Sequence, residues 1–114
     1  MRKITEDAAG AFHAGKEFKR GNTVVRVGTN EVAMFLHGNK IAMLQDGVLY
    51  VCDGGHRTMT TKERLNGLNN VHVQQKKGTW YLNDREWNAT YEWTNVEQFT
   101  LGRYIADFVS MFKQ

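Results

Sequence analysis

The spacing of apolar residues changes from helical to strand-like within the first quarter of the chain. Apolar positions first recur every three to four residues, beginning with Ile4 and Ala8, which predicts an amphipathic helix over residues 6–19. Thr5 is its predicted N-cap, because a threonine hydroxyl accepts a hydrogen bond from a free N–H of the first turn. Gly21 and the asparagine after it are predicted to end the helix.

From residue 23 onward apolar and polar residues alternate, which is the spacing of half-buried strands. Short alternating runs joined by glycine-containing turns predict an antiparallel meander. Asp46-Gly47 is the strongest hairpin signal, because a type I′ turn needs positive φ at both central residues, and Gly38-Asn39 is a second signal. The predicted strands are residues 23–27, 31–37, 40–45 and 48–52.

The next stretch predicts a short helix and a second hairpin. Thr60 and Glu63 fit a capping box, in which each side chain accepts a hydrogen bond from a backbone N–H. We therefore expect a helix over residues 61–68, with Leu65 and Leu68 facing inward. The elements predicted after it are strands over residues 71–77 and 79–82, a turn at Gly78 and a turn at Asn83-Asp84 before residues 85–87.

The end of the chain has the strongest helical periodicity. Apolar residues from Val96 to Phe112 keep a three-to-four spacing, and residues 94–97 fit another capping box. We expect a helix over residues 95–112 that covers the sheet. The whole pattern predicts one α+β domain over residues 1–114: an antiparallel sheet of short hairpin-connected strands with an N-terminal helix, a short middle helix and a C-terminal helix.

Composition agrees with a soluble globular protein. The chain has 114 residues, of which 41% are hydrophobic and 24% charged, and a domain of this size can bury a core without metals or disulfides. No apolar run reaches the roughly 18 residues that span a bilayer, and the first residues lack the apolar segment of a secretory signal. A single cysteine, Cys52, excludes an intrachain disulfide and is typical of a reducing cytosol.

Residues that could catalyse a reaction or hold a metal are not grouped in the sequence. A zinc site needs about four nitrogen or sulfur ligands, whereas only Cys52, Asp53 and His56 lie close together. Cys52 ends a predicted core strand, so a buried thiol explains it better than a nucleophile. The glycines at 54 and 55 do not fit a phosphate-binding loop. We expect no catalytic, cofactor-binding or metal-binding residue, and no enzyme.

A basic segment with aromatic neighbours is the remaining candidate for a functional surface. The net charge is only +3, but positive residues concentrate at 57–77, while residues 78–114 are acidic. Alternate residues of a strand share a face, and a face with Gln74, Lys76 and Tyr81 can bind phosphates and stack a base. A solvated face whose lysines protect an edge strand explains the same residues. The candidate partner-binding residues are Arg57, Lys62, Arg64, Gln74, Lys76, Lys77 and Tyr81.

Three segments of the chain stand out as motifs: T-T-K-E-R-L-N-G-L at residues 60–68, V-x-V-Q-Q-K-K-G-T-W-Y-L-N at residues 71–83 and L-H-G-N-K-I-A at residues 36–42. Together they resemble a family of small phage-encoded proteins of unknown function. The resemblance covers residues 8–87, and Asp84 stands where the family commonly has a glycine, a change that the hairpin should tolerate. It implies a viral origin and expression in the host cytoplasm, and it implies no activity.

These observations predict a small, non-enzymatic phage accessory protein that binds a host or phage macromolecule, with a protein as the favoured partner and no membrane contact. The alternative is a nucleic-acid-binding protein that uses the basic segment 57–77. The small net charge weighs against that alternative, because counterion release from few cationic contacts gives little affinity. An enzyme is the least favoured class.

Overall fold

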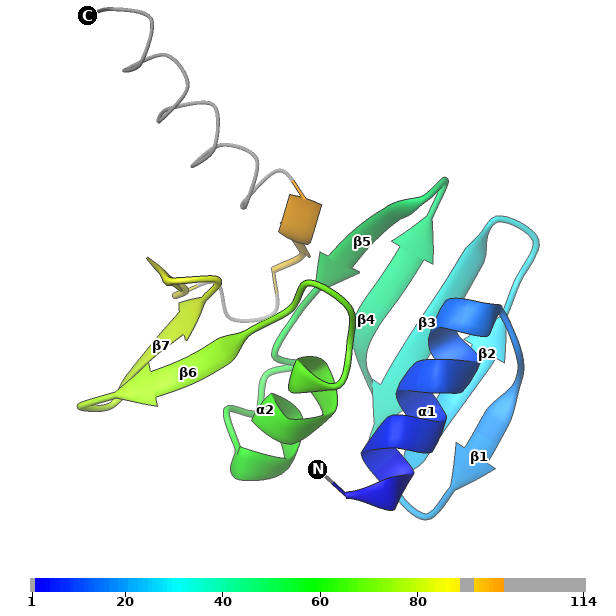
Figure 1. The fold of residues 1–114 in the computed structure, drawn as a ribbon, viewed down its shortest axis with the longest axis horizontal. Helices are drawn as coiled ribbons and strands as arrows, with labels where there is room; N and C mark the ends of the chain where they lie inside the picture. The colour runs from blue at the N-terminus through cyan, green and yellow to red at the C-terminus, as the bar shows by residue number, and fades with distance from the viewer. Residues whose placement is uncertain (1, 89–91, 98–114) are drawn as a thin grey trace, which may run out of the picture.

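The computed structural model describes residues 2–88 and 92–97 of the chain, which form an α+β fold with two antiparallel sheets (Figure 1). The helices that lie wholly within the described residues are α1 (Lys3–Ala14) and α2 (Met59–Asn66). The strands are β1 (Phe18–Arg20), β2 (Thr23–Val27), β3 (Glu31–Leu36), β4 (Asn39–Gln45), β5 (Val48–Val51), β6 (Val73–Lys76), β7 (Thr79–Leu82), β8 (Arg85–Glu86) and β9 (Thr94–Asn95).

The larger sheet confirms the predicted meander and extends it. Its strand order is β1-β2-β3-β4-β5-β9, and every neighbouring pair is antiparallel. Asp46 and Gly47 have φ values of 51° and 78°, so this turn has the positive φ at both positions that type I′ requires. The other hairpin turn lies one residue earlier than predicted, at His37 and Gly38 with φ values of 51° and 79°, because Asn39 already belongs to β4.

The smaller sheet is a separate three-stranded unit with the order β6-β7-β8. Both of its turns also have two positive φ values, 50° and 82° at Lys77-Gly78 and 50° and 68° at Asn83-Asp84. The second hairpin therefore tolerates Asp84, as predicted. Figure 1 shows α2 lying between this sheet and the layer formed by α1 and the larger sheet.

The predicted bounds and N-cap of the first helix were wrong. The helix ends at Ala14, because Gly15 adopts a left-handed conformation with a φ of 67° and its N–H bonds back to the last turn. The chain is then free to pair with β2, and Phe18–Arg20 forms β1 instead of a fifth helical turn. Thr5 is not the N-cap but a buried residue with 1% exposure.

The capping box predicted for the middle helix was also wrong, although the helix itself exists. Its N-cap is Thr58, whose Oγ1 accepts a hydrogen bond from the Thr61 N–H at 3.1 Å. The Glu63 carboxylate accepts a hydrogen bond from Thr5 Oγ1 at 2.8 Å. A long-range partner on α1 therefore replaces the local partner that the capping box assumes. The helix ends at Asn66, with Gly67 as its C-cap.

The expected C-terminal helix is not supported by the described residues. Asn95, its predicted first residue, belongs to β9, which pairs with β5. The hydroxyl of Thr94 accepts a hydrogen bond from Trp87 Nε1 at 2.9 Å, which connects β9 to the residue after β8. Residues 98–112 of the prediction lie outside the described residues.

The core lies between α1 and one face of the larger sheet and continues under α2 to the inner face of the smaller sheet. Phe12 of α1 and Met34 of β3 are fully buried, and Leu65 and Leu68 point inward as predicted. Trp80 of β7 and Trp87 are each 2% exposed and belong to the same apolar cluster. The cluster thus joins the two sheets.

The identity of the N-cap of α2 can be tested with a matched pair of variants. We expect Thr58→Ala to lower the free energy of unfolding by about 0.5–2 kcal/mol, because the Thr61 N–H loses its acceptor. Thr60→Ala should change it by less than about 0.5 kcal/mol, as ordinary surface substitutions do. Urea unfolding of both variants measures the difference. If Thr60→Ala lowers the free energy of unfolding more than Thr58→Ala does, Thr60 is the N-cap, as the capping box indicates.

The close approach of the two helices at Gly67 yields a second prediction. A Cβ at this position would lie 2.5 Å from Thr5 Cγ2 and 3.5 Å from Ala9 Cβ, so Gly67→Ala should destabilise the protein by about 1–3 kcal/mol through overpacking. Gly10→Ala is the control, because its Cβ would meet nothing within 4 Å. That variant should gain about 0.5–1 kcal/mol, since alanine favours a helix interior. Thermal melts measure both variants, and a melting temperature that changes in the same direction in both would contradict the close packing of Gly67 against α1.

Candidate functional site

The seven predicted partner-binding residues lie in three different environments. Arg64 lies in the core, with 1% exposure. Arg57 and Lys62 lie against the inner, aromatic side of the smaller sheet. The others follow the β6–β7 hairpin: Gln74, Lys76 and Tyr81 share its outer face, and Lys77 lies in its turn. The structure therefore divides the seven residues among three environments instead of placing them on one surface.

Arg64 has a structural position that links three elements. Its Nε donates to Thr23 Oγ1 of β2 at 2.9 Å, and its Nη1 donates to Thr5 Oγ1 of α1 at 2.8 Å. Longer contacts reach the Glu63 carboxylate at 3.2 Å and Asn22 Oδ1 at 3.4 Å. A buried guanidinium requires such partners, because an unpaired charge in the core is very costly. Arg64 is therefore a core residue and not part of an exposed surface.

A hydrogen bond and nearby positive charges lower the pKa of Glu63, the residue before Arg64. The hydrogen bond from Thr5 lowers the pKa of the Glu63 carboxyl, and the positive charges of Arg2 and Arg64 act in the same direction. Arg2 Nε lies 3.1 Å from Glu63 Oε2. Burial lowers the pKa of Arg64 itself, but an arginine stays protonated in proteins. The Glu63 carboxylate thus forms ion pairs with the guanidinium groups of both Arg2 and Arg64.

On the inner side of the smaller sheet, two cations lie over tryptophan rings. The Arg57 guanidinium carbon is 5.0 Å from the centre of Trp80 and 5.5 Å from that of Trp87. Arg57 Nε also donates to the buried Asp53 carboxylate at 2.9 Å. Lys62 Nζ lies 5.6 Å from the Trp80 ring and donates to Gln75 Oε1 at 2.9 Å. These contacts are internal to the fold, so both side chains hold the hairpin against α2 and the end of β5.

The outer side of the same hairpin is more open. Gln74 lies opposite Tyr81 in the β6–β7 register, and Lys76 Nζ lies 6.0 Å from the centre of the Tyr81 ring. Lys76 and Lys77 are exposed, and Gln74 and Tyr81 are partly exposed. This face therefore presents two cations, an amide and a phenol ring on one short hairpin. We refer to Gln74, Lys76, Lys77 and Tyr81 as the hairpin surface.

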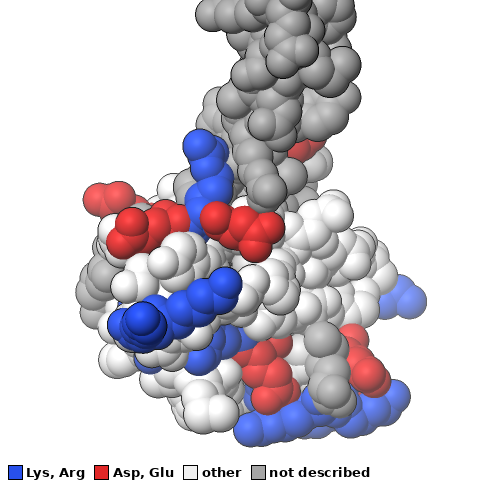
Figure 2. Space-filling model, turned by 60° about the vertical axis from the view of Figure 1, so that its left-hand side comes forward, with Lys and Arg blue, Asp and Glu red and all other residues white. Residues whose placement is uncertain are grey.

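Acidic residues border the hairpin surface. Glu86 of β8 lies directly opposite Tyr81, and Asp84 lies in the turn between β7 and β8. Figure 2 shows this side of the molecule, with lysine and arginine side chains next to aspartate and glutamate side chains. The local field is consequently mixed in sign, unlike the extended basic stripe of a dedicated nucleic-acid-binding protein.

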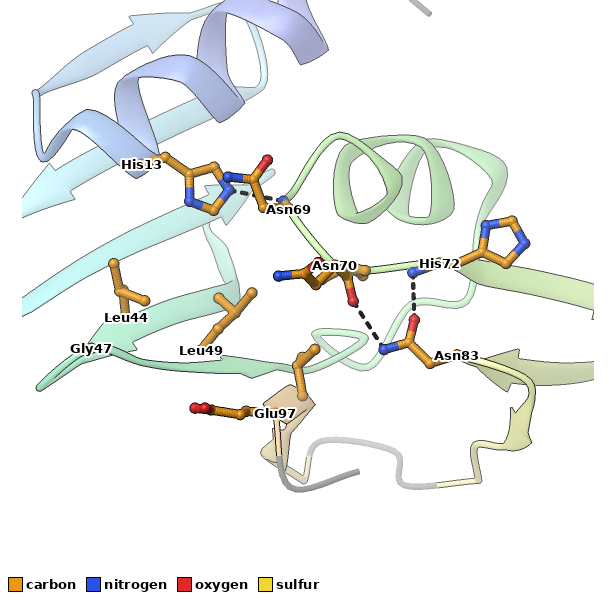
Figure 3. A pocket seen from close by; sticks show the side chains of 11 residues that line it. His13, Leu44, Gly47, Leu49, Asn69, Asn70, His72, Asn83 and Glu97 are labelled. Carbon is orange, nitrogen blue, oxygen red and sulfur yellow. Dashed lines mark hydrogen bonds between the residues drawn. The ribbon is translucent and has the colours of Figure 1, made fainter. Parts of the chain in front are cut away.

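A cleft that the sequence did not indicate lies between the larger sheet and the loop before β6. Its volume is about 900 Å³, and its lining combines aliphatic side chains, such as Leu44 and Leu49, with amides and histidines (Figure 3). Asn83 fixes one wall, because it accepts a hydrogen bond from the His72 N–H and donates one to Asn70 O. No local motif marks this cleft, since its residues come from five separate parts of the chain.

Cys52 and its neighbours have the features of a structural segment. Burial raises the pKa of the Cys52 thiol, which makes the reactive thiolate scarcer at neutral pH. A cavity of about 310 Å³ near Asp53 and His56 is lined by threonines of α2 and its N-cap and by aliphatic and polar side chains of the β3–β4 hairpin. Within residues 2–88 and 92–97, no group of three or more histidine, cysteine, aspartate or glutamate side chains is placed to hold a metal ion.

Comparison with protein families identifies the chain. Residues 1–105 match the family described as Kyanoviridae Gp96 protein. The chain belongs to this phage protein family. The match confirms the resemblance inferred from residues 36–83 and extends it at both ends.

Other comparisons add no relative. No curated protein and no solved structure matches the chain. As for membranes, neither α1 nor α2, the helices of the described residues, is long and apolar enough to cross one. The family match shows that the chain is a phage protein.

The lowered pKa of Glu63 predicts how stability depends on pH. Because folding depresses this pKa, the carboxylate stabilises the protein fully above its ordinary value of about 4.3, and the contribution is lost as the pH falls through the folded-state value. We expect the melting temperature of Glu63→Gln to fall less steeply on acidification than that of the wild type. Glu86→Gln, which removes a carboxylate from the exposed β8, is the control. Identical acid slopes for Glu63→Gln and the wild type would contradict this role of Glu63.

Proposed function

We propose that this phage protein is a small, non-enzymatic binding module that acts on a host or phage protein through the hairpin surface. The single observation that carries the proposal is the contrast between the two sides of the β6–β7 hairpin. Its inner side is fixed by Trp80 and the cations packed on it, whereas its outer side presents polar and cationic groups to solvent. The chain belongs to a phage protein family, and phage proteins are synthesised in the infected cell, so we expect this protein in the host cytoplasm.

Rigid presentation of the hairpin supports this proposal. The Asn66 side chain at the end of α2 pairs with the Val73 backbone, accepting from its N–H at 2.6 Å and donating to its carbonyl at 3.0 Å. Asn83 fixes the base of the hairpin in a similar way. A surface held by packing and hydrogen bonds loses little conformational entropy on binding, which favours affinity.

The chemistry of the hairpin surface favours an acidic protein patch as the target. Tyrosine is enriched at the energetic centres of protein interfaces, because it provides a large contact area with a polar end. Lys76 and Lys77 would complement carboxylates on the partner and accelerate encounter. Asp84 and Glu86 at the border would disfavour partners with an extended negative charge, such as a nucleic-acid backbone.

Nucleic-acid binding remains the second candidate, and one observation favours it. The lysine above the Tyr81 ring, with Gln74 alongside, could contact a phosphate while a base stacks on the ring. Three other basic residues of the predicted segment do not contribute to this face, because Arg64 is buried and Arg57 and Lys62 pack on the inner side. Binding through two lysines should be weak and sensitive to salt.

The test is a pulldown from infected host lysate with and without nuclease, using three forms of the full chain. We expect the wild type to retain a partner protein after nuclease treatment. The triple variant Lys76→Glu/Lys77→Glu/Tyr81→Ala should lose that partner, with an affinity drop of at least about tenfold in a subsequent titration, because a truncated hot spot commonly costs 2 kcal/mol or more. All three positions lie on a hairpin face that contributes little to the core.

The matched control is Lys16→Glu/Lys19→Glu, which changes the net charge equally. Both lysines are exposed on the α1–β1 side of the molecule, away from the hairpin (Figure 1). The control should keep the partner. Loss of the partner from both variants would mean that the net charge of the protein, and not the hairpin surface, determines the capture. Capture that disappears with nuclease, together with tight nucleic-acid binding at physiological salt, would instead support the second candidate.

A further inference from the structure

The larger sheet has a second face, opposite the one on which the two helices of the described residues pack. Phe12 of α1 and Leu65 of α2 belong to one apolar cluster with Met34 of β3, and Figure 1 shows α1 in front of the sheet. Alternate residues of a strand point to opposite faces. The register therefore places two cross-strand rows on the other face, which we call the back face: Lys19, Val24, Phe35 and Lys40 in one row, and Arg26, Ala33, Met43, Tyr50 and Asn95 in the next.

The back face is more apolar than a solvated sheet face usually is. Antiparallel sheets commonly bury one face and present a polar one to water. Here the two rows contain Val24, Phe35, Met43 and Tyr50, and each of these side chains is partly exposed. A contiguous group of partly exposed apolar side chains on a small protein marks a contact surface.

Trp93 adds an exposed indole ring to the back face. Thr94 pairs with Val51 of the core side, so alternation places Trp93 on the back, and Lys40 Nζ lies 5.8 Å from the centre of its ring. Trp93 is 37% exposed, whereas the tryptophans of the smaller sheet are 2% exposed. The back face thus carries aromatic rings on β3, on β5 and just before β9.

The charged side chains of the back face are mostly positive. Lys19 and Arg26 are exposed on β1 and β2, and Lys40 lies on β4 beside the Trp93 ring. A third, shorter row begins with the acidic residue Glu31. Its carboxylate accepts hydrogen bonds from Lys40 Nζ at 2.6 Å and from Gln45 Nε2 at 2.8 Å, so its charge is already paired.

Other acidic residues lie at the borders of this face. Asp46 is in the β4–β5 turn, and Glu92 precedes Trp93 on the β9 side, across the sheet from Lys19 and Arg26. The Glu17 carboxylate accepts a hydrogen bond from the Val27 N–H at the edge of β2. A positive face favours a negatively charged partner, and it disfavours a second copy of the same face, because like charges would meet.

We infer that the back face binds single-stranded nucleic acid. Aromatic side chains on a sheet stack the bases of a single strand with little regard to sequence, since every base has a π face. A duplex keeps its bases stacked on one another and cannot offer these faces. The six strands span about 24 Å at 4.8 Å per spacing, which is room for several nucleotides. The bases stack on three rings and the phosphates lie near three cations, namely Phe35, Tyr50 and Trp93, and Lys19, Arg26 and Lys40.

The first test is a titration of the full chain with a fluorescein-labelled oligothymidylate of about 12 nucleotides, followed by fluorescence anisotropy. We expect binding that weakens with salt, with a slope of log K against log salt of about −2, because three phosphate contacts contribute about 0.7 each on a single strand. A duplex of the same length should bind more weakly. No binding at about 50 mM salt, or a duplex that binds as tightly, would overturn the inference.

Paired variants of Tyr50 test the stacking. Tyr50→Ala should weaken binding by about 5-fold to 150-fold, the cost of one lost base stack. Tyr50→Phe keeps the ring and should retain the affinity of the wild type. Met59→Ala, which truncates an 82% exposed side chain on α2, is the control and should also retain it. If Tyr50→Ala remains folded by circular dichroism and binds as the wild type does, the inference is wrong.

Trp93 gives a readout that a loss of stability does not imitate. Because the other two tryptophans are buried, a base stacked on Trp93 should quench the tryptophan fluorescence of the wild type. Trp93→Phe should keep binding the labelled strand, because phenylalanine also stacks on a base, but the quenching should disappear. Quenching that persists in Trp93→Phe would place the strand on another surface.

A charge variant tests the phosphate contacts. Arg26→Glu should weaken binding and flatten the salt slope by about 0.7. Lys16→Glu makes the same change of charge at an exposed position just after α1 and should leave the slope unchanged. An equal loss of affinity in both variants would assign the binding to net charge and overturn the site.

The hairpin surface is tested separately from the back face. Lys76→Glu/Lys77→Glu/Tyr81→Ala should still bind the oligonucleotide; if it does not, while Tyr50→Ala does, the nucleic-acid site is the hairpin. Sedimentation checks for a second copy, and a dimer that Arg26→Glu or Tyr50→Ala dissociates would assign the back face to that interface instead. Capture of a protein by the hairpin surface after nuclease treatment does not depend on the back face, so failure of this inference leaves the proposed function unaffected.

Discussion

The buried guanidinium of Arg64 holds the arrangement of the elements together. It extends from α2 and donates hydrogen bonds to Thr5 on α1 and Thr23 on β2, so one side chain connects both helices to the larger sheet. Apolar packing alone would tolerate several orientations of a helix as short as α2, but a buried charge restricts it to the position where oxygen acceptors surround the group. Asn66, two residues later, then fixes β6 by pairing with Val73.

The two sheets are thereby held in a defined relation, and each presents a different chemistry. Arg57 packs on Trp80 and Trp87 while its Nε bonds to Asp53, which follows β5, so the smaller sheet is attached at a second point. Its outer face carries lysines and a tyrosine, chemistry suited to a reversible contact with another macromolecule. The larger sheet differs in chemistry, because a row of aliphatic side chains runs across β2, β3, β4 and β5, with members Val27, Val32, Leu44 and Leu49.

The chain belongs to the Kyanoviridae Gp96 family, and the proposal that it is a binding module depends on its surfaces. Cys52, the most reactive side-chain type in the chain, is buried, and burial raises its pKa. The polar groups that reach the core are occupied in holding elements together, as Thr5, Thr23 and Arg64 demonstrate. A fold organised in this way positions a short hairpin firmly, which is what a small binding protein requires.

The sequence by itself determined the antiparallel meander, the positions of its hairpins within a residue or two, and the second hairpin with its alternating faces. These features depend on local chemistry: a period of two and residues that accept positive φ. The tertiary structure decided which threonine caps α2, where α1 ends, and that Arg64 is a core residue. Thr5 bonds to Glu63 and Arg64 on the other helix, so neither Thr5 nor Glu63 makes the local cap that the sequence pattern indicates, whereas Thr58 caps α2 through a local bond to the Thr61 N–H. The cleft and the aliphatic row of Val27, Val32, Leu44 and Leu49 likewise exist only after the strands align in register, because no short segment contains them.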